Sequence, residues 1–256
     1  MAYMIEGGGS KTFAKCMIPP QKKKPHTQND SFFFFPTAKT WLYNEKEASH
    51  RLLTILTDVS ITYLVGQVKA GAQVINKHNI WCFLIFFKKK KFHKQMVQVF
   101  DSHAGELAPD LFAEFALPYL KRIDAEVKAQ LKSANIDPVP MIVFAKGAHY
   151  AIGQLVAQTG YEVVGLDWTV SVEFAKEQAK AAGRAVAFQG NLDPCILYAT
   201  DDEIKKQVRT LLTQTGTSGW IANLGHGMHP DHDPAKVAVY LKAVAETSAE
   251  LNAASK

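Results

Sequence analysis

The sequence predicts an α/β fold built on a parallel β-sheet. After residue 95, five short apolar segments alternate with longer segments whose apolar residues recur at helical spacing. A series of strand–helix units of this kind forms a parallel sheet with right-handed crossovers. Each apolar segment leads directly into small or polar residues, which is typical of the carboxyl ends of strands in parallel α/β enzymes.

The expected strands are short and apolar on both faces, as buried parallel strands are. They are Met96–Phe100, Met141–Phe144, Val163–Leu166, Ala185–Gln189 and Trp220–Leu224. The expected helices are Ala38–Lys69 with a break near Asn44, Pro109–Ala134 with a break at Pro118, His149–Gln158, Val172–Ala182, Ile204–Thr213 and Ala235–Leu251. A (β/α)₈ barrel of the TIM type needs eight such units, so about three strands are lacking at the N-terminal end.

Two segments depart from this pattern, Cys16–Thr37 and Val74–Gln95, each of 22 residues. They carry charges of +2 and +6, so the rest of the chain carries −3 of the total of +5. The basic character therefore belongs to these segments, and we expect no nucleic-acid partner. The apolar run Ile80–Phe87 followed by four lysines suits a membrane-surface anchor. We favour instead a segment that is foreign to the fold, because its local pattern disagrees with its surroundings.

Composition favours a soluble protein of a reducing compartment. No apolar run reaches the ~18 residues that span a bilayer, and the first residues lack the basic region of a signal peptide. Three widely spaced cysteines, Cys16, Cys82 and Cys195, argue against a disulfide framework. We therefore expect a cytoplasmic protein without a membrane partner.

Three polar residues stand out as candidates for a binding site: Tyr3, Ser102 and His226. Ser102 and His226 follow expected strands, and Tyr3 precedes the turn at 7–9. Each has a plainer interpretation, since Ser102 is also suited to cap a helix, His226 to a turn between glycines and Tyr3 to core packing. The glycine-rich turn lacks the lysine ending of a phosphate-binding loop, so we interpret it as a tight turn.

A metal site is the less favoured interpretation of the histidines near the C-terminus. His226, His229 and His232 are spaced three apart, but Gly227 and Pro230 exclude a regular helix. We expect no metal ligands here. The residues Asp167, Trp168 and Asp193 also follow expected strands, and we interpret them as cleft walls or structural anchors.

Several long motifs resemble the uroporphyrinogen decarboxylase family. They are FDSHAGEL, FALPYLK, GLDWTV, QGNLDPCILYA and NLGHGMHPDHDP, together with YMIEGGGS and LVGQVKAGAQ near the N-terminus. The motifs follow one another in order from Met1 to about Thr247, apart from the two departing segments. The resemblance implies a TIM-type (β/α)₈ barrel that is incomplete here.

The resemblance also implies a reaction and a set of partners. The substrate is a reduced tetrapyrrole, uroporphyrinogen, whose acetate arms lose CO₂ to give coproporphyrinogen in haem synthesis. The reaction needs no cofactor and no metal, and the family forms homodimers. The family's substrate-binding positions match Tyr3, Ser102 and His226 in this sequence.

The family pattern also includes an N-terminal part that this sequence does not match. That part holds arginines expected to bind substrate carboxylates and an aspartate expected to contact the pyrrole N–H groups, so no catalytic residue is assignable here. The expected organisation is one domain over residues 1–256, interrupted by 16–37 and 74–95, which we interpret as untranslated gene segments. An alternative is that the chain is a catalytically inactive truncated product.

Overall fold

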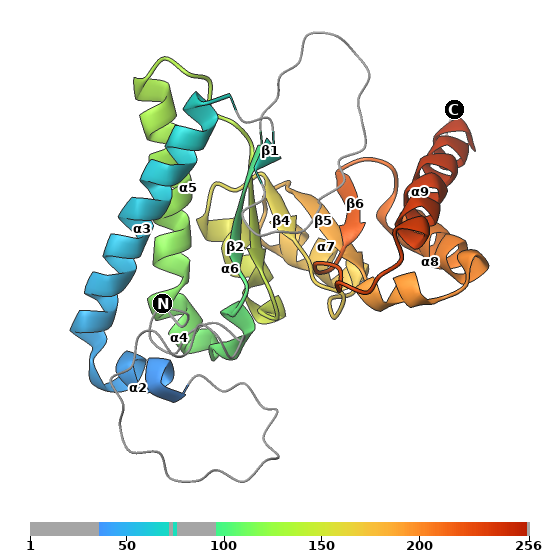
Figure 1. Cartoon of the computed structure of the whole chain (residues 1–256). Helices are drawn as coiled ribbons and strands as arrows, with labels where there is room; N and C mark the ends of the chain where they lie inside the picture. Colours follow the sequence, from blue (N-terminus) through green and yellow to red (C-terminus); the bar gives the residue numbers. More distant parts are fainter. Residues whose placement is uncertain (1–35, 72–73, 76–95, 255–256) are drawn as a thin grey trace, which may run out of the picture.

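The computed structural model describes residues 36–71, 74–75 and 96–254. They form a six-stranded parallel sheet in the order β1-β2-β3-β4-β5-β6, so that each strand lies beside its neighbour in sequence. Figure 1 shows an open, twisted sheet with helices along its outer side and at both ends. The strands are β1 (Val74–Ile75), β2 (Met96–Asp101), β3 (Met141–Ala145), β4 (Val163–Gly165), β5 (Ala187–Leu192) and β6 (Trp220–Leu224).

The helices follow the predicted order. They are α2 (Pro36–Asn44), α3 (Lys46–Lys69), α4 (Pro109–Phe115), α5 (Leu117–Ser133), α6 (Ile152–Gln158), α7 (Val172–Ala181), α8 (Asp201–Thr215) and α9 (Pro234–Ala254), with the 3₁₀ turns η1 (Ala104–Glu106), η2 (His149–Ala151) and η3 (Pro194–Tyr198). The predicted break near Asn44 is confirmed, because α3 begins two residues later. The predicted break at Pro118 is also confirmed, since α5 begins at Leu117 with this proline in its first turn.

Helix starts are set by local side-chain chemistry. The Thr200 hydroxyl accepts a hydrogen bond from the Glu203 amide (3.3 Å) at the start of α8. The Ser171 hydroxyl does the same for the Phe174 amide (3.2 Å) at the start of α7.

The largest difference between the predicted and the observed strands is the end of β5. Strand β5 was expected to stop at Gln189, but pairing with β6 continues to Leu192. The extra residues are held from the side as well, because the Asn191 amide donates to the Asp167 and Val170 carbonyls at 3.0 and 2.6 Å.

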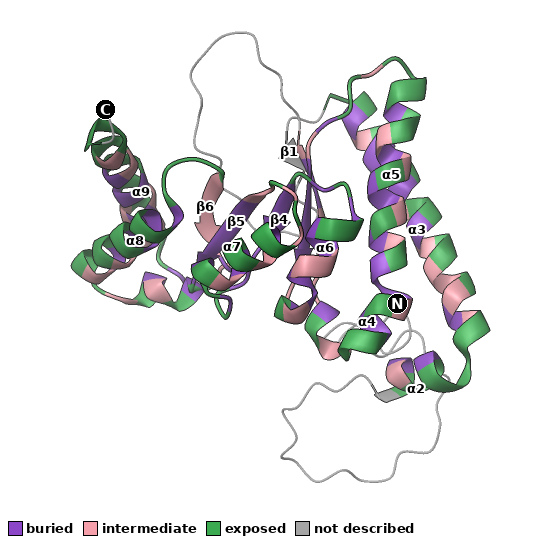
Figure 2. Ribbon diagram, turned by 180° about the vertical axis from the view of Figure 1, so that it is seen from behind, coloured by how far each residue is buried: buried purple, intermediate pink, exposed green. Residues whose placement is uncertain are grey.

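The core lies between the sheet and its outer helices (Figure 2). Side chains from β2, β3 and β4, such as Val97, Val143 and Val164, pack there against α5 and α6. A second cluster joins β6 to α8 and α9 through Val208, Leu212 and Val244. Strand alternation places the other face of the sheet on the opposite side, where the Gln189 side chain donates to Gln98 at 3.1 Å.

The described residues do not close a barrel. Strand β1 pairs only with β2, and β6 pairs only with β5, so both are edge strands within this part of the chain. The incomplete barrel expected from the sequence agrees with this arrangement.

Candidate functional site

The candidate site lies at the carboxyl ends of the strands, called here the carboxyl edge of the sheet, where the loops after β2, β3, β4 and β6 meet. These loops carry Ser102, Lys146, Trp168 and His226. Because the strands are parallel and adjacent in sequence order, all four loops leave the sheet at the same edge.

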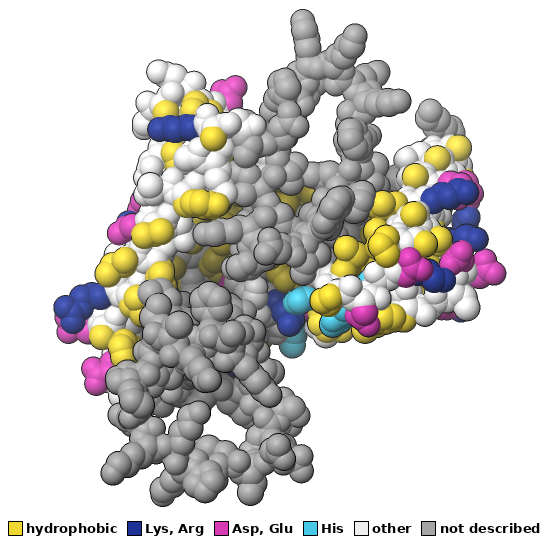
Figure 3. Space-filling view, in the orientation of Figure 1, with side chains coloured by type: hydrophobic (Ala, Val, Ile, Leu, Met, Phe, Trp, Pro, Cys, Tyr) yellow, Lys and Arg dark blue, Asp and Glu magenta, His cyan; other side chains and the backbone are white. Residues whose placement is uncertain are grey.

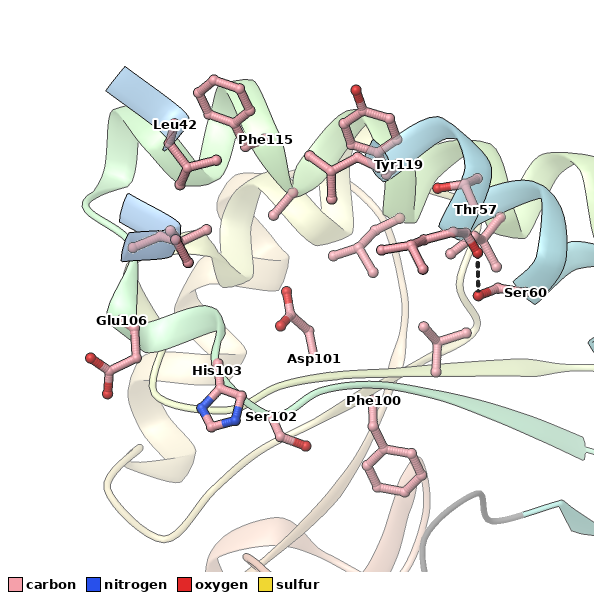
Figure 4. Close-up of a pocket in the computed structure, with 18 of the residues that line it drawn as sticks. Leu42, Thr57, Ser60, Phe100, Asp101, Ser102, His103, Glu106, Phe115 and Tyr119 are labelled. Carbon is pink, nitrogen blue, oxygen red and sulfur yellow. Dashed lines mark hydrogen bonds between the residues drawn. The ribbon is translucent and has the colours of Figure 1, made fainter. Parts of the chain in front are cut away.

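Ser102 follows β2 directly, in a turn before η1. Figure 4 shows the side chains of Phe100 and Ser102 on one side of the strand and that of Asp101 on the other, toward α3 and α5. η1 begins at Ala104 with His103 as its N-cap residue, and no side-chain hydrogen bond caps it. The plainer interpretation of Ser102, a helix cap, is therefore wrong.

His226 lies in the loop after β6 and its ring is exposed. It meets Trp168 in an edge-to-face arrangement, with ring centroids 5.9 Å apart. On Trp168 the Lys146 ammonium sits 5.8 Å from the ring centroid, in cation–π range. The loops after β3, β4 and β6 thus contribute one cluster of contacting side chains, Lys146, Trp168 and His226. Figure 3 shows histidine side chains beside a basic side chain on this part of the surface.

The charge of Lys146 affects the pKa of His226 and also that of His103, which lies in the loop after β2. Desolvation lowers the pKa of His226 from its ordinary value, and the Lys146 charge lowers it further. Desolvation likewise lowers the pKa of His103, again with a contribution from Lys146 that opposes the effect of Glu106. Both imidazoles therefore favour the neutral form near pH 7.

Asp167 anchors the loops from beneath. Its carboxylate accepts hydrogen bonds from the Gly147 amide (2.7 Å), the Thr169 amide (2.9 Å) and the Thr169 hydroxyl (2.5 Å). It is buried, so these bonds replace its hydration. The predicted anchor role agrees with these contacts, and Asp193 similarly accepts from the Cys195 amide at 2.9 Å to begin η3.

Two glycine contacts bring the loops together. A Cβ on Gly225 would lie 2.4 Å from the Trp168 amide nitrogen, and one on Gly105 would lie 2.7 Å from Gly147 backbone atoms. Only glycine permits such approaches without a shift of the backbone. The loops after β4 and β6, and those after β2 and β3, are thereby held in direct contact.

A cavity of about 340 Å³ lies between β2 and the helices α2 to α5, and Ser102 and His103 are among the residues that line it. Figure 4 shows Asp101 pointing into it, with Phe115, Tyr119 and Thr57 on the helical walls. Its lining is mainly apolar, and desolvation raises the pKa of Asp101 there. A cavity that disfavours a negative charge is poorly suited to a ligand with many carboxylates.

The three predicted site residues fare differently. Ser102 and His226 lie on loops of one edge of the sheet, whereas Tyr3 lies outside the described residues. Sequence reasoning missed Lys146 as a candidate, although it follows the strand β3 directly, as Ser102 follows β2.

Two of the C-terminal histidines, His229 and His232, contact each other. His232 is buried, its Nδ1 accepts a hydrogen bond from the His229 amide (3.2 Å), and its ring lies against Tyr198 with centroids 4.3 Å apart. Among residues 36–71, 74–75 and 96–254, no group of three or more His, Cys, Asp or Glu side chains could hold a metal ion.

The sequential strand order β1 to β6, with polar side chains at the carboxyl ends of the strands, is the arrangement of a TIM-type barrel that is incomplete in the described residues. A solved methyltransferase from Methanosarcina mazei shares this fold, with a TM-score of 0.62 and 18% identity over 82% of this chain and 53% of its own. The model of the family Uroporphyrinogen decarboxylase (URO-D) matches residues 34–94 and 93–247.

Named relatives agree with the family match. The chain is 46% identical to the uroporphyrinogen decarboxylase of Ovis aries over 244 residues, which is 95% of this chain and 53% of that protein. It is 46% identical to that of Schizosaccharomyces pombe and 40% identical to that of Salinibacter ruber, covering 94% and 97% of this chain and 55% of each relative. The chain belongs to the uroporphyrinogen decarboxylase family, and it spans about half the length of these relatives.

Proposed function

We propose that the complete protein removes the acetate carboxyl groups of uroporphyrinogen to give coproporphyrinogen. The observation that carries the proposal is the placement of Ser102 and His226 on loops at one sheet edge, in a chain of this family. The substrate is a polycarboxylate, and hydroxyl and imidazole groups are hydrogen-bond donors for carboxylates.

The chemistry follows from proton transfer and positioning. Protonation of a pyrrole ring makes it an electron sink, and the carboxylate electrons flow into it as CO₂ leaves. Protonation of the exocyclic carbon then completes the methyl group, and the ring releases the proton that it first gained, which restores the pyrrole. In this scheme Ser102 and Tyr3 hydrogen-bond to carboxylate arms. His226, whose pKa is lowered, is neutral near pH 7 and is able to donate one N–H to an arm or to pass on a proton.

A second candidate is that this chain binds the tetrapyrrole but does not turn it over. Strands β1 and β6 are unpaired on one side within the described part of the chain, and the chain spans about half of its relatives. The family's arginines and aspartate, which the resemblance assigns to substrate binding and to the cationic intermediate, have no counterpart that we can name here.

The two candidates are separated by one assay. Purified chain is incubated with uroporphyrinogen under anaerobic conditions, and coproporphyrinogen is measured by chromatography, while binding of the oxidised form uroporphyrin is followed by tryptophan quenching. Product formation supports the decarboxylase, binding without product supports the inactive chain, and the absence of both contradicts a tetrapyrrole site in this chain.

We further propose that segments 16–37 and 74–95 are absent from the functional protein. The support is the local sequence of both segments, which lacks the strand and helix periodicity of their surroundings. The family match itself continues through the second segment to residue 94. Strand β1 uses the first two residues of that segment, which pair with Met96 and Val97. Sequencing the mature transcript tests the proposal, and finding both segments in frame would contradict it.

The complete protein is also proposed to be a cytoplasmic homodimer. Family membership supports the dimer, and the cysteine usage supports a reducing compartment. No helix among the described residues is long and apolar enough to cross a membrane. Sedimentation of the purified protein and cell fractionation are the corresponding measurements.

A further inference from the structure

Lys146 is a basic residue at the carboxyl edge that lies outside the motifs described above. It follows strand β3, so its backbone is fixed by the sheet, and its carbonyl accepts a hydrogen bond from the Gly105 amide at 2.8 Å. The same residue's amide donates to the Asp101 carbonyl at 3.1 Å. These two bonds fasten Lys146 to the loop that carries Ser102.

The side chain of Lys146 reaches the other half of the edge. Its ammonium lies over Trp168, and Trp168 in turn meets His226 edge-to-face. An ammonium on an aromatic face keeps part of its hydration and all of its charge, so it remains available to an anion. Lys146 is half-buried, which limits the solvent screening of that charge.

The ion pairs found within the described part of the chain do not include Lys146. Most other lysines of the described helices are paired, for example Lys46 with Glu114 (2.8 Å), Lys128 with Glu162 (2.7 Å) and Lys236 with Asp201 (2.7 Å). Asp167, a buried carboxylate at this edge, accepts hydrogen bonds from Gly147 and Thr169. Lys146 is thus a positive charge beside Trp168, and its charge lowers the pKa of both His226 and His103.

We propose that Lys146 binds a carboxylate arm of the tetrapyrrole substrate and, through its charge, sets the affinity of this edge for acidic tetrapyrroles. The inference rests on the proposed function and deepens it by assigning a further binding residue. An arriving carboxylate compensates the lysine charge. It also favours the protonated form of the neighbouring His226, so the lysine and the imidazole act together on the ligand.

The test measures binding of uroporphyrin to the purified full-length chain. Titrations followed by tryptophan quenching at low and moderate salt compare wild type with K146M, K146R and K242M. Lys242 is an exposed residue of α9 that pairs with Glu246 at 3.8 Å, and it serves as the matched control for loss of one positive charge. Circular dichroism and thermal unfolding show whether each variant is folded.

The expected result is about tenfold weaker binding by K146M, the size of one well-placed charge–charge contact. Binding should be restored largely in K146R and unchanged in K242M, and K146M should respond less to added salt. A second readout does not depend on the porphyrin: the pKa of His226, followed by NMR, should rise in K146M because the repelling charge is gone.

Equal binding by wild type and K146M overturns the assignment of Lys146 and leaves the proposed function standing. Absence of binding by the wild-type chain overturns the proposed function, and the assignment with it. If K146M fails to fold, the comparison between K146R and wild type decides: loss of binding in a folded K146R contradicts a role that rests on charge alone.

Discussion

Adjacent residues at the end of β2 face two regions of different chemistry. Asp101 points into the cavity beneath α3 and α5, where the walls are apolar and desolvation raises the pKa of its carboxyl group. Ser102 points to the opposite side (Figure 4), at the edge that carries Lys146 and His226. The better enclosed region is thus the less suitable one for an anionic ligand, and charge rather than volume distinguishes the two.

The regions also differ in how they are held. The cavity is bounded largely by side chains of helices, such as Phe115 and Tyr119. The edge is held by backbone contacts at Gly225 and Gly105 and by the buried carboxylate of Asp167. A binding site benefits from the second kind of support, because its groups are already in place before the ligand arrives.

The largest expected effect comes from breaking the backbone contact at the edge. Gly225→Ala places a Cβ against the Trp168 amide, so the loops after β4 and β6 must separate. We expect a loss of roughly 3 kcal/mol in the free energy of unfolding and loss of uroporphyrin binding. Chemical denaturation and the quenching titration measure the two effects.

Gly66→Ala is the matched control for that change. Gly66 lies within α3 with open space around its Cβ position, so alanine should stabilise the helix by up to ~1 kcal/mol. Equal stability changes in the two variants would contradict the close contact at Gly225.

The next effect concerns pH. His226 faces Lys146, His229 and Asp167, and its pKa is lowered in the free protein. A bound carboxylate favours the protonated ring, so binding takes up a proton and uroporphyrin affinity should rise several-fold between pH 8 and pH 6. His226→Gln should bind more weakly and show a flatter pH profile, the remainder coming from His103. A profile identical to wild type would exclude His226 from the site.

A smaller effect is expected in the cavity. The folded-state pKa of Asp101 is raised, so the protein binds a proton that the unfolded chain releases, and stability falls as pH increases from about 4 toward the folded-state pKa. Asp101→Asn removes this loss and should stabilise the protein at pH 7 by roughly 0.5–1 kcal/mol, with little change at pH 4. Denaturation at both pH values measures the free energy of unfolding. A variant that is less stable than wild type at pH 7 would show that the protein stabilises the charged carboxylate of Asp101, which would contradict this prediction.

The smallest expected effect is that of a substitution in the wall of the cavity, and it distinguishes the cavity from the carboxyl edge as the place of binding. Leu56→Phe adds volume at the wall of the cavity and should change the free energy of unfolding by less than ~1.5 kcal/mol. Uroporphyrin binding should be unaffected. Weaker binding in this variant would place the ligand in the cavity instead of at the edge.

Much of the fold was predictable from the sequence because its signals are local. Apolar periodicity and the prolines at 109 and 118 located the strands β2 to β6 and the division between α4 and α5. The extension of β5 to Leu192 was not predictable, since it depends on pairing with β6 and on side-chain bonds from Asn191.

The site was only partly predictable for the same reason. Ser102 and His226 stand in distinctive motifs, but Lys146 gains its importance from Trp168 and His226, which lie far away in sequence. The contact at Gly225 likewise joins two loops that are separated by the whole of α7, β5 and α8.

Porphyrin-sensitised photo-oxidation tests the central claim most directly. Bound uroporphyrin is illuminated, and oxidised histidine, tryptophan and tyrosine residues are mapped by peptide mass spectrometry against a sample with an uncharged free dye. The edge site predicts that oxidation concentrates on His226 and Trp168, neither of which lines the cavity. Preferential oxidation of Tyr119, which lines the cavity and is hydrogen-bonded to His50 (2.7 Å), would contradict it.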